Sequence, residues 1–180
     1  ANKVLHIFGL GAYHSGVQIF DTEFAFGAHD NASTGVYETT PRKSTQGAYR
    51  KTIEMGTCVL PIEEIFEIIE ELKIEFVGCT YDLFSKNCNH FSNALCLRLV
   101  NKPIPAYLNR LSRILKPFQC LLSKEFLAAH NPKVNPKHKR ADSIFVAKRK
   151  KKNKNDASKS IEVQNLVSNE ERQNPSIIVA

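Results

Sequence analysis

A cysteine stands at the predicted start of a helix. Cys88 follows Asn87, a residue type favoured at the N-cap, and Phe91, Leu95 and Leu99 recur after it at helical spacing. The positive end of a helix dipole stabilises a thiolate, and so lowers the thiol pKa from its free value of about 8.5. Cys88 is therefore a candidate nucleophile.

A thiol nucleophile needs a base, and two histidines are candidates. His90 lies two positions after Cys88, about 200° around a helix axis, so the two side chains point apart. His14 lies far away in the sequence, on a predicted strand beside Gly16, which allows another backbone or a substrate to approach closely. Papain-like thiol hydrolases pair a strand histidine with a helix-start cysteine in this way. Spacing alone leaves open that Cys88 is a buried core thiol and His14 an ordinary, hydrogen-bonded histidine.

The elements that must position these residues change from strands to helices along the chain. Residues of alternating polarity predict strands at 13–20, 24–27, 35–39 and 49–58. Apolar residues at helical spacing predict helices from Pro61 through Leu72, from Asn87 through Leu99, over 106–115 and over 118–127. The glutamates of the first helix predict a solvated acidic face on a helix that packs through its other side.

The basic charge is confined to the end of the chain. Residues 1–129 hold 13 Lys and Arg against 13 Asp and Glu, whereas residues 130–180 hold 12 against 5, which accounts for the net charge of +7. The last part has one aromatic residue, Phe145, and a like-charge run, Lys148–Lys152. We therefore expect a folded domain over 1–129 and a basic, disordered tail over 130–180.

Composition excludes several classes of protein. The 180 residues, 42% of them hydrophobic, are enough for one domain with a proper core. No run approaches the ~18 apolar residues of a membrane-spanning helix, and no secretory signal is visible. We expect a cytoplasmic protein, with Lys148–Lys152 as a nuclear-import signal in the alternative.

The cysteines do not predict a disulfide framework or a zinc site. Five cysteines at irregular gaps are more typical of free thiols. Cys79, Cys88, His90 and Cys96 are close in sequence, but they lack the paired spacing of structural zinc sites. We expect no metal and no cofactor. The other cysteines are expected to be small buried hydrophobes, and His29 to be a structural loop residue.

Several separated blocks of the sequence resemble the PPPDE family, the desumoylating-isopeptidase type of thiol peptidase, and most closely its second branch, found in plants and animals. They follow the family's order and spacing over roughly residues 8–125. The blocks are Phe8–Gly11, Tyr13–Gly16, Phe26–His29, Ser33–Glu38, Pro41-Arg42, Thr80–Leu83, Lys86–Ser92 and Lys102–Leu111.

The resemblance implies an α+β fold, a permuted papain-like thiol peptidase in which an antiparallel β-sheet packs with helices and the histidine precedes the cysteine. His14 and Cys88 match the family's catalytic pair. The family acts on isopeptide bonds of SUMO or ubiquitin conjugates, so ubiquitin- or SUMO-conjugated proteins are the expected partners. The family also opens with an apolar strand ahead of its histidine segment, and here only residues 1–7 are available for it.

The expected mechanism is that of a cysteine isopeptidase. His14 would hold the Cys88 thiol as a thiolate, which would attack the carbonyl of a Gly–Lys isopeptide and form an oxyanion. The Cys88 backbone N–H is the natural donor to that oxyanion, and Asn87 and Asn89 are side-chain candidates for oxyanion binding or positioning.

Two other functions stay open. The same Cys–His pair would serve a protein S-acyl (palmitoyl) thioesterase, since some family members resemble such enzymes. Alternatively, the chain would be an inactive interaction protein whose basic tail makes weak, salt-sensitive contacts with nucleic acid or binds an import receptor. In that case the apolar end, Ile177–Ala180, would add a strand to a partner.

Overall fold

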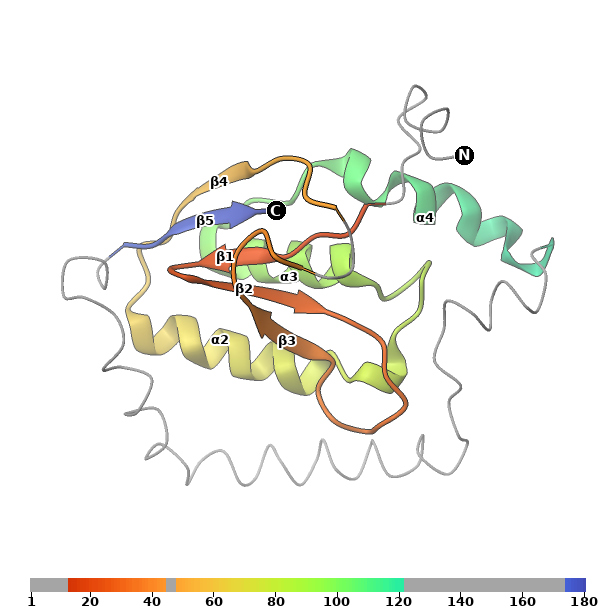
Figure 1. The fold of residues 1–180 in the computed structure, drawn as a ribbon, viewed down its shortest axis with the longest axis horizontal. Coiled ribbons are helices and arrows are strands. Elements are labelled where there is room, and N and C mark those ends of the chain that lie inside the picture. The colour runs from red at the N-terminus through yellow and green to blue at the C-terminus, as the bar shows by residue number, and fades with distance from the viewer. Residues whose placement is uncertain (1–12, 45–47, 122–173) are drawn as a thin grey trace.

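The structure, a computed structural model, describes residues 13–44, 48–121 and 174–180. Four strands come first along the chain, the helices follow, and a last strand returns to the sheet (Figure 1). The strands are β1 (Val17–Ile19), β2 (Thr22–Phe26), β3 (Val36–Thr39), β4 (Ile53–Thr57) and β5 (Ser176–Val179). The α-helices are α2 (Ile62–Glu75), α3 (Cys88–Val100) and α4 (Arg110–Leu115), and the 3₁₀-helices are η1 (Gly78–Thr80), η2 (Ala106–Asn109) and η3 (Lys116–Leu121).

The strands form one sheet in the order β3-β2-β1-β5-β4, and every neighbouring pair is antiparallel. The predicted α+β class, with helices packed on an antiparallel sheet, is therefore confirmed. Each of the four strands predicted between residues 13 and 58 occurs; three are shorter than predicted, and β2 begins two residues earlier and ends one residue earlier than predicted. The predicted third helix, 106–115, is divided into η2 and α4, and of the predicted fourth only the part up to residue 121 lies within the described residues, in η3.

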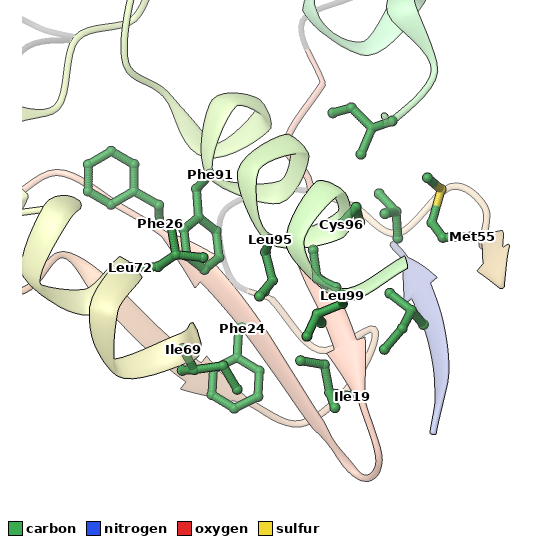
Figure 2. Close-up of a cluster of buried hydrophobic side chains, with 14 of the residues drawn as sticks. Ile19, Phe24, Phe26, Met55, Ile69, Leu72, Phe91, Leu95, Cys96 and Leu99 are labelled. Atoms are coloured by element: carbon green, nitrogen blue, oxygen red, sulfur yellow. The ribbon is translucent and has the colours of Figure 1, made fainter. Parts of the chain in front are cut away.

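Helix α3 is the central support of the sheet. Its apolar side chains Phe91, Leu95 and Leu99 lie toward the sheet residues Ile19, Phe24 and Phe26, with Ile69 and Leu72 of α2 beside them, whereas Cys96 lies on the side of the helix toward Met55 (Figure 2). Phe91 and Leu95 are fully buried. The helix begins at the predicted position and ends at Asn101, whose left-handed backbone caps it. Packing therefore fixes α3, and with it Cys88, against the sheet.

The fifth strand comes from the far end of the chain. Residues 176–179 lie between β1 and β4, the blue strand of Figure 1, and pair with both. Gly16 and Ala180 exchange two backbone hydrogen bonds of 3.1 and 3.0 Å, and Cys58 N–H donates to Pro175 O at 2.9 Å. Ile177 and Val179 are buried in the core. Since β5 is the only sheet neighbour of β4 among the described residues, it joins β4 to the rest of the sheet.

This strand corrects one expectation and restricts another. The alternative of an interaction protein needs the apolar end of the chain to be available to a partner, but this end is paired within the chain's own sheet, because two strands offer it backbone partners and the core buries its side chains. The last seven residues of the expected disordered tail are thus part of the fold. Residues 130–173 lie outside the described residues, and the predicted boundary at 129 stays a prediction.

Candidate active site

Helix α3 begins at Cys88 because a capping box closes its first turn. The Asn87 Oδ1 atom accepts the backbone N–H of His90 at 3.1 Å, and the His90 Nδ1 atom accepts the backbone N–H of Asn87 at 3.2 Å. Asn87 Nδ2 donates to Leu83 O at 2.8 Å and lies 3.1 Å from Asn109 Oδ1. The cap therefore fixes the first helical residue, and the sulfur it carries, at one place.

The Cys88 sulfur is buried and has several hydrogen-bond donors near it. The residue is 5% exposed, and Sγ is 4.0 Å from Tyr13 O. Burial raises the pKa of the thiol above its ordinary value of 9.0, against a smaller lowering by hydrogen bonds from the backbone N–H groups of Ser15 and Asn89 and from the Tyr81 hydroxyl. In this state the thiol is protonated. The backbone N–H groups at the helix start do lower the thiol pKa, as expected, but burial raises it by more, so the expected net lowering is wrong.

Asn89 hydrogen-bonds the segment around His14, which precedes β1, to α3. Its Nδ2 atom donates to Tyr13 O at 3.0 Å and to Leu108 O at 3.1 Å, and its Oδ1 atom accepts the Ser15 hydroxyl at 2.8 Å. The Ser92 hydroxyl, one turn further along the helix, lies 2.9 Å from that of Ser15. The residues on both sides of His14 are thus held against the helix that begins with Cys88.

A tyrosine of the sheet, Tyr37, contacts the ring of His14. Its Nε2 atom is 3.3 Å from the Tyr37 hydroxyl, which projects from β3. Burial lowers the pKa of His14 below its ordinary value of 6.5, so the imidazole is neutral near pH 7. A neutral imidazole can accept a proton, which is what a thiol nucleophile requires of its base.

The structure brings His14 and Cys88 to adjacent backbone segments without a direct hydrogen bond. Among the described residues, the sulfur and the imidazole are not bonded to each other; Tyr13 O and the Ser15 N–H, which flank His14, contact the sulfur instead. The Tyr37 phenol, which contacts His14, also interacts electrostatically with Cys88. Burial raises the pKa of Tyr37, and the charge of a Cys88 thiolate raises it further. A protein without substrate often shows such loose catalytic contacts.

The two asparagines predicted as oxyanion or positioning candidates have structural partners. Both side chains are buried, and the amide groups of Asn87 and Asn89 already face protein oxygens. These contacts suit a positioning role, and whether either amide also binds the oxyanion stays a prediction.

Sequence reasoning missed two tyrosines of the site. Tyr37 binds His14, and Tyr81 hydrogen-bonds Cys88; burial, together with the neighbouring Cys88, raises the pKa of Tyr81 far above its ordinary value of 10.0. Both lie in blocks that carried the family resemblance, Ser33–Glu38 and Thr80–Leu83. That was the available signal, but only the folded chain brings the two phenols to the sulfur and the imidazole.

The remaining histidines of the folded part have structural roles. The His90 ring belongs to the capping box, and its Nε2 atom lies 2.9 Å from Asn109 Nδ2. His29, as expected, is a loop residue: its Nδ1 accepts the Asn31 N–H at 3.2 Å, its Nε2 donates to Thr34 O at 2.9 Å, and the ring lies against Gly78, where a Cβ atom would clash. Neither ring is hydrogen-bonded to Cys88.

The other cysteines are free thiols, as Cys88 is. Cys58, Cys79 and Cys96 are buried as expected, whereas Cys120 is exposed, so the expectation that it is a buried hydrophobe is wrong. Within residues 13–44, 48–121 and 174–180 no cluster of His, Cys, Asp and Glu side chains could hold a metal ion. In the same residues no helix has both the length and the apolar character needed to cross a bilayer.

Two basic residues lie beside the segment that carries His14. Arg50 is placed over the ring of Tyr13, 5.9 Å from its centroid, and Lys51 over the ring of Tyr107 at 4.8 Å. The two tyrosine rings meet edge to face at 5.9 Å. The segment before β4 therefore packs over the residue that precedes His14.

Comparison with known proteins places these residues in a family context. Residues 1–126 match the family described as "PPPDE putative peptidase domain". A DeSI-like protein of Arabidopsis thaliana is 39% identical over 121 residues, which are 67% of this chain and 54% of the plant protein. The DeSI-like protein sdu1 of Schizosaccharomyces pombe is 44% identical over 115 residues, 63% of this chain and 57% of the yeast protein. The human protein named desumoylating isopeptidase 1 is 29% identical over 102 residues, 56% of this chain and 58% of the human protein.

These relatives extend beyond the matched region. The chain spans little more than half the length of the plant, yeast and human proteins. The matched residues include His14, Tyr37, Tyr81 and Cys88, and so contain all four side chains that the structure gathers.

Proposed function

The chain belongs to the PPPDE peptidase family, and on that premise we propose that it is a thiol isopeptidase that releases a SUMO-type modifier from lysine side chains. The family match supports peptidase chemistry, and the names of relatives such as the human desumoylating isopeptidase 1 support SUMO conjugates as the substrate class. Ubiquitin conjugates and S-acylated proteins are the other substrate classes that the same nucleophile could serve.

One observation carries the assignment of Cys88 and His14. Asn89, at the second position of α3, bonds the residue on each side of His14, so this histidine, in the segment before β1, is held next to the first turn that bears Cys88. The other histidines of the described residues have their rings engaged in loop or cap contacts. His14 is therefore the base available to this thiol.

The proposed first step is a proton transfer coupled to attack. Because burial favours the neutral thiol and the neutral imidazole, substrate meets Cys88–SH and unprotonated His14. His14 takes the thiol proton as sulfur bonds to the isopeptide carbonyl carbon, and the carbonyl π electrons move to oxygen. The resulting oxyanion would receive hydrogen bonds from the Cys88 backbone N–H at the helix start and from the Tyr81 hydroxyl, both of which already bond the sulfur.

The remaining steps return the enzyme to its starting state. The oxyanion collapses, the C–N bond breaks, and the leaving lysine amine takes the proton from the His14 imidazolium. Water then attacks the thioester carbonyl while His14 accepts one of its protons. The proton passes to Cys88 as the C–S bond breaks, and the modifier leaves with a free carboxylate.

The experiment compares three substrates with the same two variants. The chain would be incubated with SUMO and with ubiquitin, each joined at its C-terminal glycine to a fluorescent amine, and with an S-acyl thioester. We expect turnover of the SUMO substrate that is lost in Cys88→Ala and in His14→Ala and kept in Cys120→Ser, the exposed thiol control. Turnover of the SUMO substrate that survives Cys88→Ala would reject the nucleophile.

A separate outcome of the same experiment tests the substrate class. Cys88-dependent turnover confined to ubiquitin or to the thioester would keep the thiol hydrolase and replace the proposed substrate. The free thiols are the reason to place the proposed activity in the cytoplasm, with the nucleus as the alternative raised by the basic run Lys148–Lys152.

A further inference from the structure

We propose that Tyr37 is the positioning residue of His14: its phenol oxygen accepts the ring Nε2–H and thereby leaves the Nδ1 atom bare to take the thiol proton of Cys88. This proposal rests on the proposed function, because it assigns the third member of that site. The observation behind it is the 3.3 Å contact between Tyr37 Oη and His14 Nε2.

The fold holds Tyr37 firmly in place. It lies on β3, where it pairs with Ala25 of β2, and the neighbouring pair Val36 and Phe26 is buried in the core. The phenol is hydrogen-bonded by the Ser44 side chain, so the ring is anchored through its backbone and through its hydroxyl. A side chain held at both ends can orient a mobile partner such as an imidazole.

Tyr37 stays a neutral phenol, which suits an acceptor of an N–H group. Burial, the charge of a Cys88 thiolate and the buried carboxylate of Glu23 all raise its pKa, against a lowering by the Ser44 hydrogen bond. The oxygen of a neutral phenol has lone pairs that can accept His14 Nε2–H. When Nδ1 gains the thiol proton, the ring becomes cationic, and the N–H···O bond to Tyr37 becomes stronger.

The groups around His14 come from each neighbouring element. Tyr37 projects from β3, Cys88 begins α3, and Tyr81 follows η1. The charge of Glu23, on β2, acts on Tyr37. Of these, Tyr37 is the one that is hydrogen-bonded to the ring. A pH profile of the activity therefore reports on His14 in the presence of these four groups.

The test is Tyr37→Phe, which keeps the ring and removes only the hydroxyl. We expect kcat on the SUMO–amine substrate to fall about tenfold or more, with a smaller change in KM, since a hydrogen bond to a charged group is lost in the step that forms the imidazolium. Loss of this acceptor disfavours the imidazolium, so the acidic limb of the profile should move to lower pH. Tyr37→Gln, whose amide oxygen can accept the same N–H, should recover part of kcat.

Controls separate positioning from packing. Tyr49→Phe removes a phenol that is bonded to Thr52 at 2.7 Å on the surface, and we expect it to leave kcat and the pH profile unchanged. The melting temperature of Tyr37→Phe should stay close to that of the wild type. A loss of kcat accompanied by a matching loss of melting temperature, with an unmoved pH profile, would overturn the proposal in favour of a packing role.

The outcomes also separate this proposal from the proposed function. Unchanged kcat and an unchanged profile in Tyr37→Phe, while His14→Ala still abolishes turnover, would overturn the role of Tyr37 and leave the isopeptidase intact. Turnover that persists in both His14→Ala and Cys88→Ala would instead overturn the proposed function, and the role of Tyr37 with it.

Discussion

Asn89 Nδ2 donates a hydrogen bond of 3.0 Å to Tyr13 O, across 76 positions of sequence. This contact joins the first turn of α3, which bears Cys88, to the segment before β1, which bears His14. The same side chain binds Leu108 O and Ser15 Oγ, so one buried amide connects three segments of the chain. The geometry of the proposed site depends on this amide more than on any direct contact between its two reactive side chains.

Replacement of this amide should therefore destabilise the protein and disturb the site. Asn89→Ala removes the amide that donates to Tyr13 O and Leu108 O and accepts the Ser15 hydroxyl, which should cost about 2–4 kcal/mol of unfolding free energy. Urea denaturation would measure it, with Asn31→Ala in an exposed loop as the control, expected to change stability by less than about 0.5 kcal/mol. A change in Asn89→Ala no larger than in the control would show that the amide does not hold these segments together.

The reactivity of Cys88 should be low at neutral pH in the absence of substrate. Its pKa is raised above 9.0, chiefly by burial, so the thiolate fraction is small at pH 7 and grows as the pH rises past 9. We expect the alkylation of Cys88 by iodoacetamide, followed by mass spectrometry of its peptide, to be slow at pH 7 and to accelerate toward high pH. Rapid alkylation at pH 6 would instead indicate a preformed thiolate–imidazolium pair.

The activity should persist in mildly acidic solution. Burial lowers the pKa of His14 below 6.5, so the neutral base remains dominant at pH 6.5 and becomes protonated only at lower pH. We expect kcat/KM on the SUMO–amine substrate to fall on an acidic limb whose midpoint is below 6.5. A midpoint above 6.5 would mean that a negative group, such as a Cys88 thiolate, stabilises the imidazolium.

The end of the chain should be required for folding. Ile177→Asp places a carboxylate in the core next to β1 and β4 and should cost more than about 4 kcal/mol, whereas Ser176→Asp, on an exposed position of the same strand, should cost little. Thermal unfolding of the full chain would compare the two.

A second measurement tests the strand itself. A chain lacking residues 174–180 should have a lowered melting temperature, and a synthetic peptide of residues 174–180 should raise it again, because the peptide can pair with both β1 and β4. A truncated chain that melts like the intact one would show that β5 contributes nothing to the sheet.

Local chemistry in the sequence was sufficient for much of the architecture. Strand alternation at 13–20 and helical spacing after Asn87 predict β1 and α3, because each pattern reflects which side of its own element is buried. Asn87 predicts where α3 begins, because capping is a contact within one turn. Separated sequence blocks also indicated the family, and with it the candidate pair His14 and Cys88.

Other features depend on contacts between distant residues, and only the tertiary structure decides them. The position of β5 between β1 and β4, the use of Asn89 as a connector, and the approach of Tyr37 to His14 join positions separated by tens to more than a hundred residues. The raised pKa of Cys88 is of the same kind. A helix start lowers a thiol pKa locally, but the desolvation that outweighs it comes from the segments folded over the sulfur, and no local pattern records that burial.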